Sequence, residues 1–362
     1  MFSFTCRGIV SAALISSALI VGSFPSAFAQ TNSVQELLQQ GDFEAVSQIW
    51  EDAIANGDLS NMRNLAKLHY SGALRLSDTA RALELLKSAL DAGDIAASLD
   101  LGYIYQGGIG VQKDLAAAEY YFELAYQAGN NEAAYLYSKL ILSRSASDQE
   151  IGAALEALRR SSMVGYGPSL SAVADLMRTG TYMPTNLQTA VDYYEKAGQN
   201  GYFQGFNSIG DMYAFAEMGP ADLNKAVEWY ELAASNGIAA ANYSLAMILY
   251  SNPESSEEDL TRAFEYAKVA ALSWDEGAQT LLGRMYLEGR AVPIDAFEAY
   301  FWLDLAASAS VLEAHHLRAI ASQMIGNDKS EQAHTSASEW FTQNHATPHI
   351  HRLLEDNFHA FK

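Results

Sequence analysis

A unit of 36 residues recurs along most of this 362-residue chain. A helix–turn–helix of that length cannot bury its apolar face alone, so neighbouring units must stack to form a continuous core. The repeat therefore predicts a stacked array rather than two or three independent globular domains. A seventh unit begins at Asp275 after one extra residue, and the first six begin at Asp58, Asp94, Asn130, Tyr166, Tyr202 and Ile238.

Small residues occupy fixed positions in every unit. The eighth residue after each unit start is always small: Ala66, Gly102, Ser138, Ala174, Gly210, Ala246 and Gly283. In the second half of each unit one position is always alanine: Ala82, Ala118, Ala154, Ala190, Ala226, Ala263 and Ala299. Small side chains let one helix approach another closely, so these positions predict the contacts between the two helices of a pair.

The second helix of each unit has a start signal and a buried face. Four residues before the invariant alanine stand Asp78, Asp114, Glu150, Asn186, Asp222, Asp259 and Asp295, and six of these are residue types that cap a helix start. Seven residues after this helix start, the side chain is usually a large aromatic ring. Eleven residues after it, the side chain is small, like the alanine four residues after it. Spacings of four, seven and eleven fall on one face of a helix. Five units end on a glycine suited to the left-handed C′ position: Gly93, Gly129, Gly165, Gly201 and Gly237.

These residues resemble the Sel1-like repeat, a 36-residue relative of the tetratricopeptide repeat. The second unit carries the resemblance most fully, and the fifth and seventh units match nearly as well. The third and sixth units depart from it, because Ser143-Arg144-Ser145 and Ser251-Asn252-Pro253 replace the glycine-rich turn. The expected fold is all-α, a right-handed α-solenoid of Sel1-like, tetratricopeptide-like helix pairs. The matching residues of the second unit are Leu101, Gly102, Tyr105, Gly108, Gly110, Asp114, Ala118, Tyr121, Ala125 and Gly129.

The first 29 residues have the layout of a secretory signal. One positive charge at Arg7 precedes the apolar stretch 9–21, and Ala27-Phe28-Ala29 supplies the small residues of a cleavage site. A membrane anchor is the alternative, but the apolar stretch is short for a bilayer. The only cysteine, Cys6, lies in this leader. We therefore expect export without disulfides, to a periplasm (if the source is Gram-negative) or as a secreted protein.

The remaining chain divides at the ends of the repeats. We expect N-terminal capping helices over 30–57, seven Sel1-like repeats over 58–310 and a C-terminal capping helix pair over 311–345. An amphipathic, histidine-containing tail helix is expected over 346–362. It either caps the last hairpin, the interpretation that we favour, or is a detachable peptide for a partner.

Composition and motifs argue against several functions. A net charge of −21 disfavours nucleic acid as a partner, since phosphate binding needs clustered Lys and Arg. No nucleophile elbow, zinc-binding helix or phosphate loop occurs, and Gly107–Gly110 is better explained as the turn between helices. His351, Glu355 and His359 share a helix face that could hold a metal, but a solvated face is the simpler interpretation. We therefore predict no catalytic residues, no cofactor and no metal.

The resemblance implies a non-catalytic scaffold or regulator of the cell envelope that binds a protein or peptide in a concave groove. A polysaccharide-binding envelope component is the alternative, and an envelope hydrolase is a weaker one. Tetratricopeptide-type arrays line that groove with their first helices, so polar positions there are the candidate partner-binding residues. They are Arg63, Lys67, Tyr70, Tyr103, Tyr135, Lys139, Arg178, Tyr243, Tyr250 and Arg284. Tyr and Arg predominate at binding hot spots. Four of the tyrosines, Tyr103, Tyr135, Tyr243 and Tyr250, could also stack on sugars.

Overall fold

The computed structural model describes residues 34–38, 40–71, 73, 74, 76 and 78–345, and this part of the chain consists of helices and turns without a strand. The expected signal peptide (1–29) and tail helix (346–362) lie outside it. Among the described helices, none has both the length and the apolar character that a membrane span requires.

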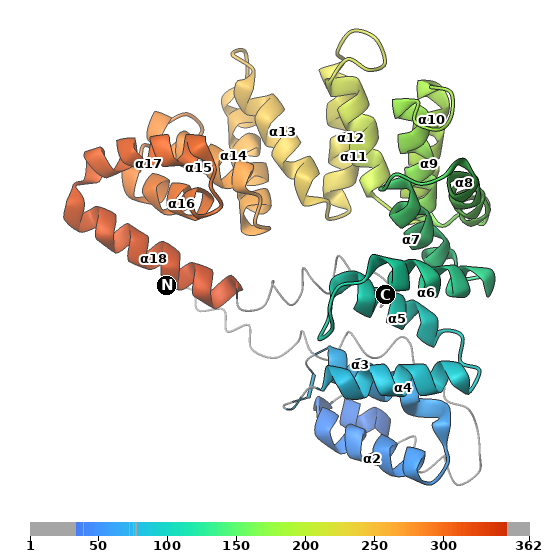
Figure 1. Ribbon diagram of the computed structural model, residues 1–362. Coiled ribbons are helices and arrows are strands. Elements are labelled where there is room, and N and C mark those ends of the chain that lie inside the picture. Colours follow the sequence, from blue (N-terminus) through green and yellow to red (C-terminus); the bar gives the residue numbers. More distant parts are fainter. Residues whose placement is uncertain (1–33, 39, 72, 75, 77, 346–362) are drawn as a thin grey trace. The chain divides into compact units, whose positions relative to one another are not determined.

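The helices follow one another in pairs (Figure 1). Residues 34–38, α2 (Phe43–Ala55) and the short η1 (Leu59–Asn61) precede the first pair. The first helices of the pairs are α3 (Met62–Tyr70), α5 (Ala97–Gly107), α7 (Asn131–Leu142), α9 (Gly167–Thr179), α11 (Gln204–Ala214), α13 (Ala239–Ser251), α15 (Glu276–Glu288) and α17 (Leu312–Ile325). The second helices are α4 (Thr79–Asp91), α6 (Leu115–Gln127), α8 (Asp148–Met163), α10 (Leu187–Gln199), α12 (Leu223–Ser235), α14 (Glu257–Leu272), α16 (Ala296–Ser308) and α18 (Asn327–His345).

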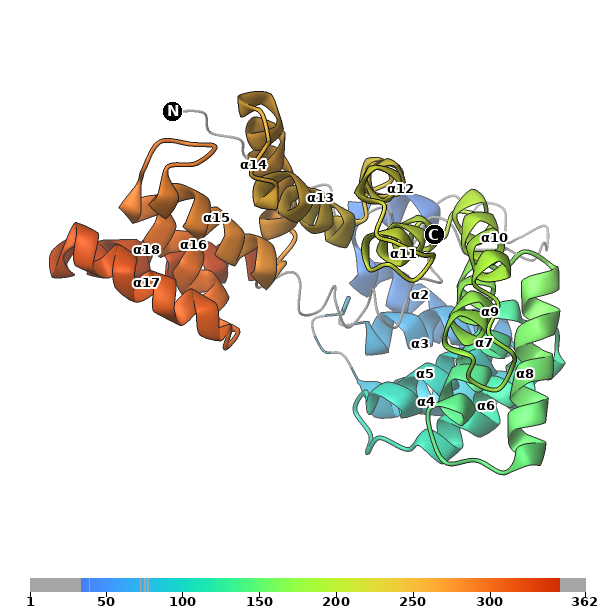
Figure 2. The ribbon, with the colours of Figure 1, turned by 90° about the horizontal axis from the view of Figure 1, so that it is seen from above.

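The described residues form two compact units, and the boundary lies between Ser161 and Ser162. In unit 1, the helices α3, α4, α5, α6 and α7 pack in sequence order, each against its neighbour in this series. In unit 2, the same sequential packing runs from α9 to α18, and Figure 2 shows its pairs from above. Consecutive pairs stacked in this way confirm the expected all-α solenoid fold.

The core of each pair is built on the invariant alanines. All seven, from Ala82 to Ala299, are completely buried. The position seven residues after each helix start, which is usually aromatic, was expected to be the buried one. The position one residue further is buried more consistently. Its members are 0–2% exposed: Leu86, Phe122, Leu158, Tyr194, Tyr230, Ala267 and Leu303. A spacing of eight falls on the same helix face as four and eleven, which explains this burial.

Glycine in the first helix makes room for that buried side chain. A Cβ atom added to Gly102 would lie 2.4 Å from the ring of Phe122. At Gly283 the added atom would lie 2.3 Å from Leu303. Both distances are far below van der Waals contact, so glycine at these positions sets how closely the two helices of a pair pack.

Two second helices begin differently from the expectation. Asp78, Asp114 and three other expected caps accept hydrogen bonds from backbone N–H groups of the first turn. Glu150 and Asp259, however, are not caps but the third residues of their helices. Ser256 is the N-cap of α14 and forms a capping box with Asp259, and Ser147 makes the same reciprocal contacts with Glu150. Both helices therefore start three residues early and have 16 residues instead of 13.

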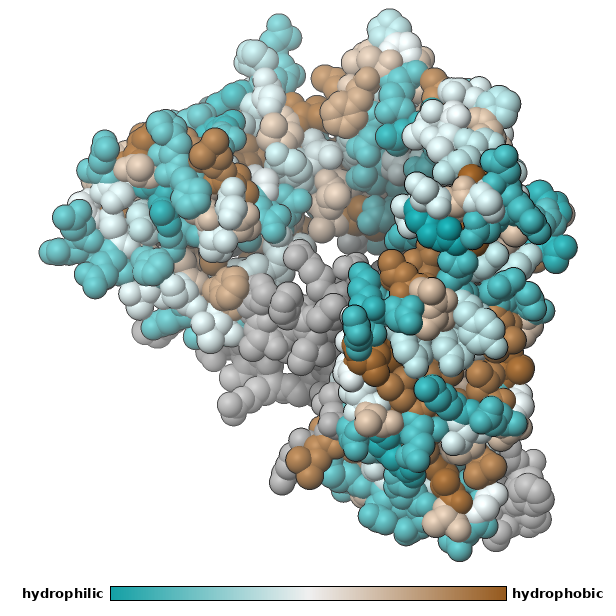
Figure 3. All heavy atoms as spheres, in the orientation of Figure 1, coloured by the Kyte–Doolittle hydropathy of each residue, from teal (hydrophilic) through white to brown (hydrophobic). Residues whose placement is uncertain are grey.

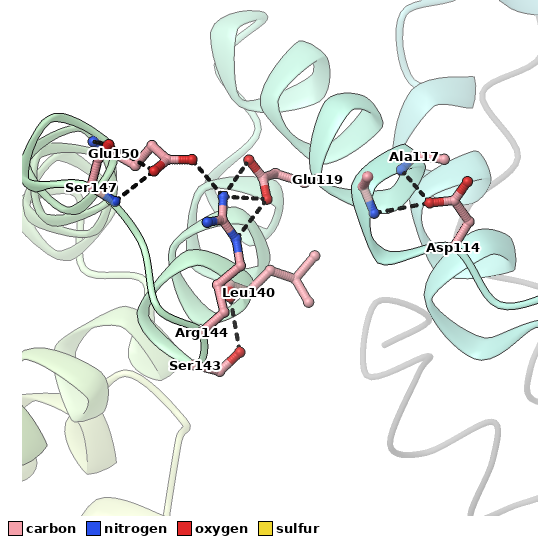
Figure 4. Close-up of polar contacts among 9 residues, drawn as sticks. Asp114, Ala117, Glu119, Leu140, Ser143, Arg144, Ser147 and Glu150 are labelled. Atoms are coloured by element: carbon pink, nitrogen blue, oxygen red, sulfur yellow. Dashed lines mark hydrogen bonds and ion pairs between the residues drawn. The ribbon is translucent and has the colours of Figure 1, made fainter.

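An arginine stabilises the turn of the third unit in place of glycine. Figure 4 shows the guanidinium of Arg144, just after α7, between Glu119 of α6 and Glu150 of α8. Its Nη2 lies 3.0 Å from Glu119 Oε2 and 2.7 Å from Glu150 Oε1. Hydrogen bonds from Arg144, and then from Ser147, lower the pKa of Glu150 from about 4.5 to about 2.

This arrangement predicts an acid-sensitive contribution to stability. A carboxyl with a depressed pKa stabilises the folded state above its unfolded value near 4.5, and that contribution is lost as the pH falls towards 2. Arg144→Ala should therefore lower the urea midpoint at pH 7 and have little effect near pH 2. Urea unfolding of both proteins across this range tests the prediction. Lys87→Ala, which removes another exposed cation, should show no such pH dependence. An Arg144→Ala effect that stays constant down to pH 2 would contradict the assignment.

Candidate functional site

The predicted partner-binding residues of unit 1 lie on three successive first helices. We use the name first-helix face for Arg63, Lys67 and Tyr70 of α3, Asp100 and Tyr103 of α5, and Glu132, Tyr135 and Lys139 of α7. On α3 these positions are four and seven residues apart, so they project from one side of the helix. Polar contacts connect α3 to α5 and α5 to α7, which makes the face one continuous polar network, with Tyr70, Asp100 and Tyr103 as its buried members.

Asp100 is the centre of the contact between α3 and α5. Its side chain is only 5% exposed, and its two oxygens accept hydrogen bonds from Arg63 Nε and, at 3.1 Å, from the Tyr70 hydroxyl. Burial, and then the neighbouring carboxylate, raise the pKa of Tyr70 well above its ordinary value, so the phenol stays a donor. The Arg63 side chain is 28% exposed, and the buried Asp100 therefore positions a guanidinium that reaches the surface.

The second contact joins α5 to α7. The Tyr103 hydroxyl donates to Glu132 Oε1, and its ring packs edge-on against Phe122 at 5.5 Å. Tyr103 is 5% exposed, so it acts mainly inside the protein. Tyr135 is half-buried, and the exposed Lys139 lies with Nζ 5.8 Å from the centre of its ring.

Lys67 lies between these two contacts. Burial lowers its pKa, while the carboxylates of Asp100, Asp94 and Glu132 oppose that shift. Its ammonium group is thus partly dehydrated at the edge of a mixed-charge surface. A partly dehydrated cation costs less to desolvate further when a partner docks.

The four predicted residues of unit 2 are also near acidic side chains, and the acidic neighbour of the half-buried Tyr243 is Asp275. Arg178 Nε lies 3.0 Å from Glu217, and Arg284 pairs with Glu313. Tyr250, 4% exposed, donates to Glu288 at 2.6 Å under the guanidinium of Arg290. These contacts connect successive repeats within unit 2, like those of unit 1.

These arginines and tyrosines were predicted from the sequence, whereas most of their acidic partners were not. Asp100, Glu132 and Glu288 lie 37, 29 and 38 residues after Arg63, Tyr103 and Tyr250. An acidic residue about one repeat after an arginine or tyrosine was therefore a signal that the sequence contained. Whether the ten residues bind a partner stays a prediction.

The chemistry of the first-helix face suits recognition. Among the described residues, no three His, Cys, Asp or Glu side chains gather closely enough to hold a metal ion. Figure 3 shows hydrophobic and hydrophilic patches mixed over unit 1 on the side in view. Surfaces of mixed polarity with ordered Arg and Tyr side chains are typical of protein–protein interfaces.

Stacked helix pairs and an extended face of paired charges define a helical-repeat solenoid. In every repeat, the second helix contributes the same buried alanine to the core. The first helices carry polar side chains at equivalent positions. The chain belongs to the Sel1 repeat family. The family model, described as Sel1 repeat, matches six segments: residues 62–94, 95–130, 167–202, 207–238, 239–273 and 277–311. The pair α7–α8 lies between the second and third of these.

Solved structures agree with this fold. A protective antigen of uropathogenic Escherichia coli, c5321, which displays an SLR fold, is 23% identical with a TM-score of 0.63, and the match covers 91% of this chain and 72% of that one. A Sel1 repeat protein from Oxalobacter formigenes is also 23% identical, with a TM-score of 0.59, and the match covers 69% of this chain and 99% of that one. No curated protein has significant sequence similarity to the chain. At this identity the structural matches show the fold alone.

Proposed function

We propose that the protein is a non-catalytic scaffold or regulator of the cell envelope, exported to the periplasm or secreted, which binds a protein or peptide through its first-helix face. Sel1 repeat proteins are generally protein–protein interaction scaffolds. The single observation that supports the proposed site is the continuous polar network across α3, α5 and α7. Internal carboxylates hold its Arg and Tyr side chains in place, and preorganised side chains lose less entropy on binding.

The structure gives little support to polysaccharide binding. Sugar stacking needs an open aromatic face. Of the four tyrosines proposed for it, Tyr103 and Tyr250 are 5% and 4% exposed, and only Tyr135 and Tyr243 are half-buried. A protein or peptide partner is therefore the function that we favour.

The test is a crosslinking pull-down from the native cell envelope. Lys67→Glu with Lys139→Glu reverses two charges of the first-helix face without breaking the Arg63–Asp100 pair. A matched control, Lys87→Glu with Lys113→Glu, reverses two exposed charges elsewhere in unit 1. We expect wild type and control to capture the same partner and the first variant to lose it, at equal helicity by circular dichroism. Reversal of two rim charges should weaken binding roughly tenfold or more.

Three results would contradict the proposed surface: equal capture by both variants, equal loss in both, or no capture above background by the wild type. Loss of binding in a Tyr135→Ala variant with no effect of charge reversal would favour a glycan instead.

A further inference from the structure

A hollow of about 370 Å³ lies at the C-terminal end of unit 2. It is bordered by α16, α17 and α18, outside the segments that match the family model except at α16. Its volume falls within the range of small-molecule sites. Neither the repeat pattern nor the proposed function accounts for it.

A buried carboxylate organises the polar wall of the hollow. Asp304 of α16 has a side chain only 7% exposed, and its oxygens pair with Arg318 Nη1 of α17 at 2.5 Å and with His334 Nδ1 of α18 at 2.7 Å. The Arg318 side chain is 32% exposed and that of His334 is 60% exposed. The acid thus borders the hollow as a nearly buried group, and the Arg318 and His334 side chains that it orients are more exposed.

Two side chains that border the hollow have hydrogen-bond donors to offer a ligand, Arg318 and the exposed His315 of α17. His334 instead donates from Nδ1 to Asp304, and the hydroxyls of Ser308 and Thr342 donate to backbone carbonyls of their own helices. Arginine has five N–H donors in a forked geometry, and only Nη1 is used by Asp304. An anionic oxygen acid is the chemical group that fits such a wall.

Apolar side chains also line the hollow. They are Leu305, Ala307, Ala337 and Phe341, whose ring is 38% exposed. Phe341 packs at 90° against Trp274, 5.6 Å away, so the ring is held in place. A ligand for this hollow needs an apolar body as well as an anionic group.

We propose that this hollow binds a carboxylate attached to an apolar group, with Arg318 and His315 facing the carboxylate and Phe341 facing the apolar body. The carboxylate is either that of a small organic acid or the C-terminus of a peptide with an apolar last residue. The site also accounts for part of the histidine clustering in the C-terminal region of the sequence. It is independent of the first-helix face.

Calorimetric titration of the full chain tests the proposal with two pairs of probes. The first pair is 3-phenylpropionate and its amide, and the second is acetyl-Ala-Ala-Phe with a free or an amidated C-terminus. We expect at least one acid to bind about tenfold more tightly than its amide, because the amide loses the charge-assisted hydrogen bonds. The acid that binds identifies the source of the carboxylate.

Two histidine variants locate the binding site. His315→Gln should weaken binding of that acid by about three- to tenfold, since it removes one donor of the wall. His316→Gln is the matched control, an exposed neighbour that does not border the hollow, and should leave binding unchanged. Arg318→Lys, which keeps the charge beside Asp304, should weaken binding because the fork is lost.

Equal affinity for an acid and its amide would overturn the proposal. So would equal effects of His315→Gln and His316→Gln, or the absence of saturable binding by both acids up to about 10 mM. A failure of these titrations would leave the pull-down result unaffected.

Discussion

Replacing Gly102 with valine is expected to destabilise unit 1 by about 2–3 kcal/mol, because an overpacked core must shift side chains and backbone. The first added carbon alone would lie 2.4 Å from the ring of Phe122, which is completely buried and in contact with Tyr103. The ring therefore has little freedom to move aside. Urea unfolding followed by circular dichroism measures the loss, and the transition of unit 1 should move to lower denaturant.

Gly152 supplies the control for this prediction. It lies inside α8, is exposed, and a Cβ added there would meet nothing within 4 Å. Gly152→Val should leave stability within about 0.5 kcal/mol of wild type, since only helix propensity changes. Combining Gly102→Val with Phe122→Ala should cost at least about 1 kcal/mol less than the sum of the single changes. Additive costs would show that the close approach does not limit packing at Gly102.

The sequence was sufficient to predict the fold because the repeat samples the same position seven times. A single alanine says little, but alanine at every equivalent position from Ala82 to Ala299 indicates a helix–helix contact, and all seven are buried. The row that includes Phe122, Tyr194 and Tyr230 was harder to detect, since its members vary in size and polarity. These side chains share only their burial. How deeply each is buried depends on how closely the small residue of the first helix lets the two helices approach.

The starts of α8 and α14 show where the repeat pattern misleads. Glu150 and Asp259 are aligned with true caps, but a serine three residues earlier takes that role in both helices. The reciprocal bond between the serine and the acid is a capping box, which a search of each unit by itself can recognise. Alignment across units concealed it, because it assumes that every second helix begins at the same position.

A similar limit explains Trp274. It stands after α14, where five other units have glycine, and it adopts a positive φ of 69°. Such a backbone is unfavourable for a bulky residue. The indole packs on Trp340 of α18 at a centroid distance of 4.8 Å, and this contact offsets the strain. Trp340 comes 66 residues after Trp274 in the sequence. Local patterns therefore could not predict that tryptophan replaces glycine at this position.

The predicted binding residues show the same limit of the repeat pattern. Their spacing on α3, four and seven residues, predicts one side of that helix. Their partners depend on the offset between neighbouring repeats, which the period alone does not specify. Hence Arg63 was predictable as a surface candidate. The burial of Tyr70, and the contact of both side chains with Asp100, became evident only in the structure.

That contact leads to the second large effect. Asp100→Asn should destabilise unit 1 by about 1–3 kcal/mol, because it keeps the shape but removes the charge that pairs with Arg63 in a nearly buried site. The amide also places an N–H donor against a donor, either Arg63 Nε or the Tyr70 hydroxyl. The cost stays below that of a fully buried pair, since Arg63 is 28% exposed and can be rehydrated. Urea unfolding at pH 7 provides the measurement.

Glu84→Gln is the matched surface change. Glu84 pairs with Arg81 of the same helix at 2.7 Å and is 67% exposed, so its loss should cost less than about 0.5 kcal/mol. If the two variants lose the same stability, Asp100 is not a buried organising group. If Asp100→Asn instead lowers stability while Arg63→Met in the same background adds little, the two side chains act as a unit. The arginine would then owe its place on the first-helix face to the acid beneath it, and that dependence links the fold of unit 1 to its proposed binding surface.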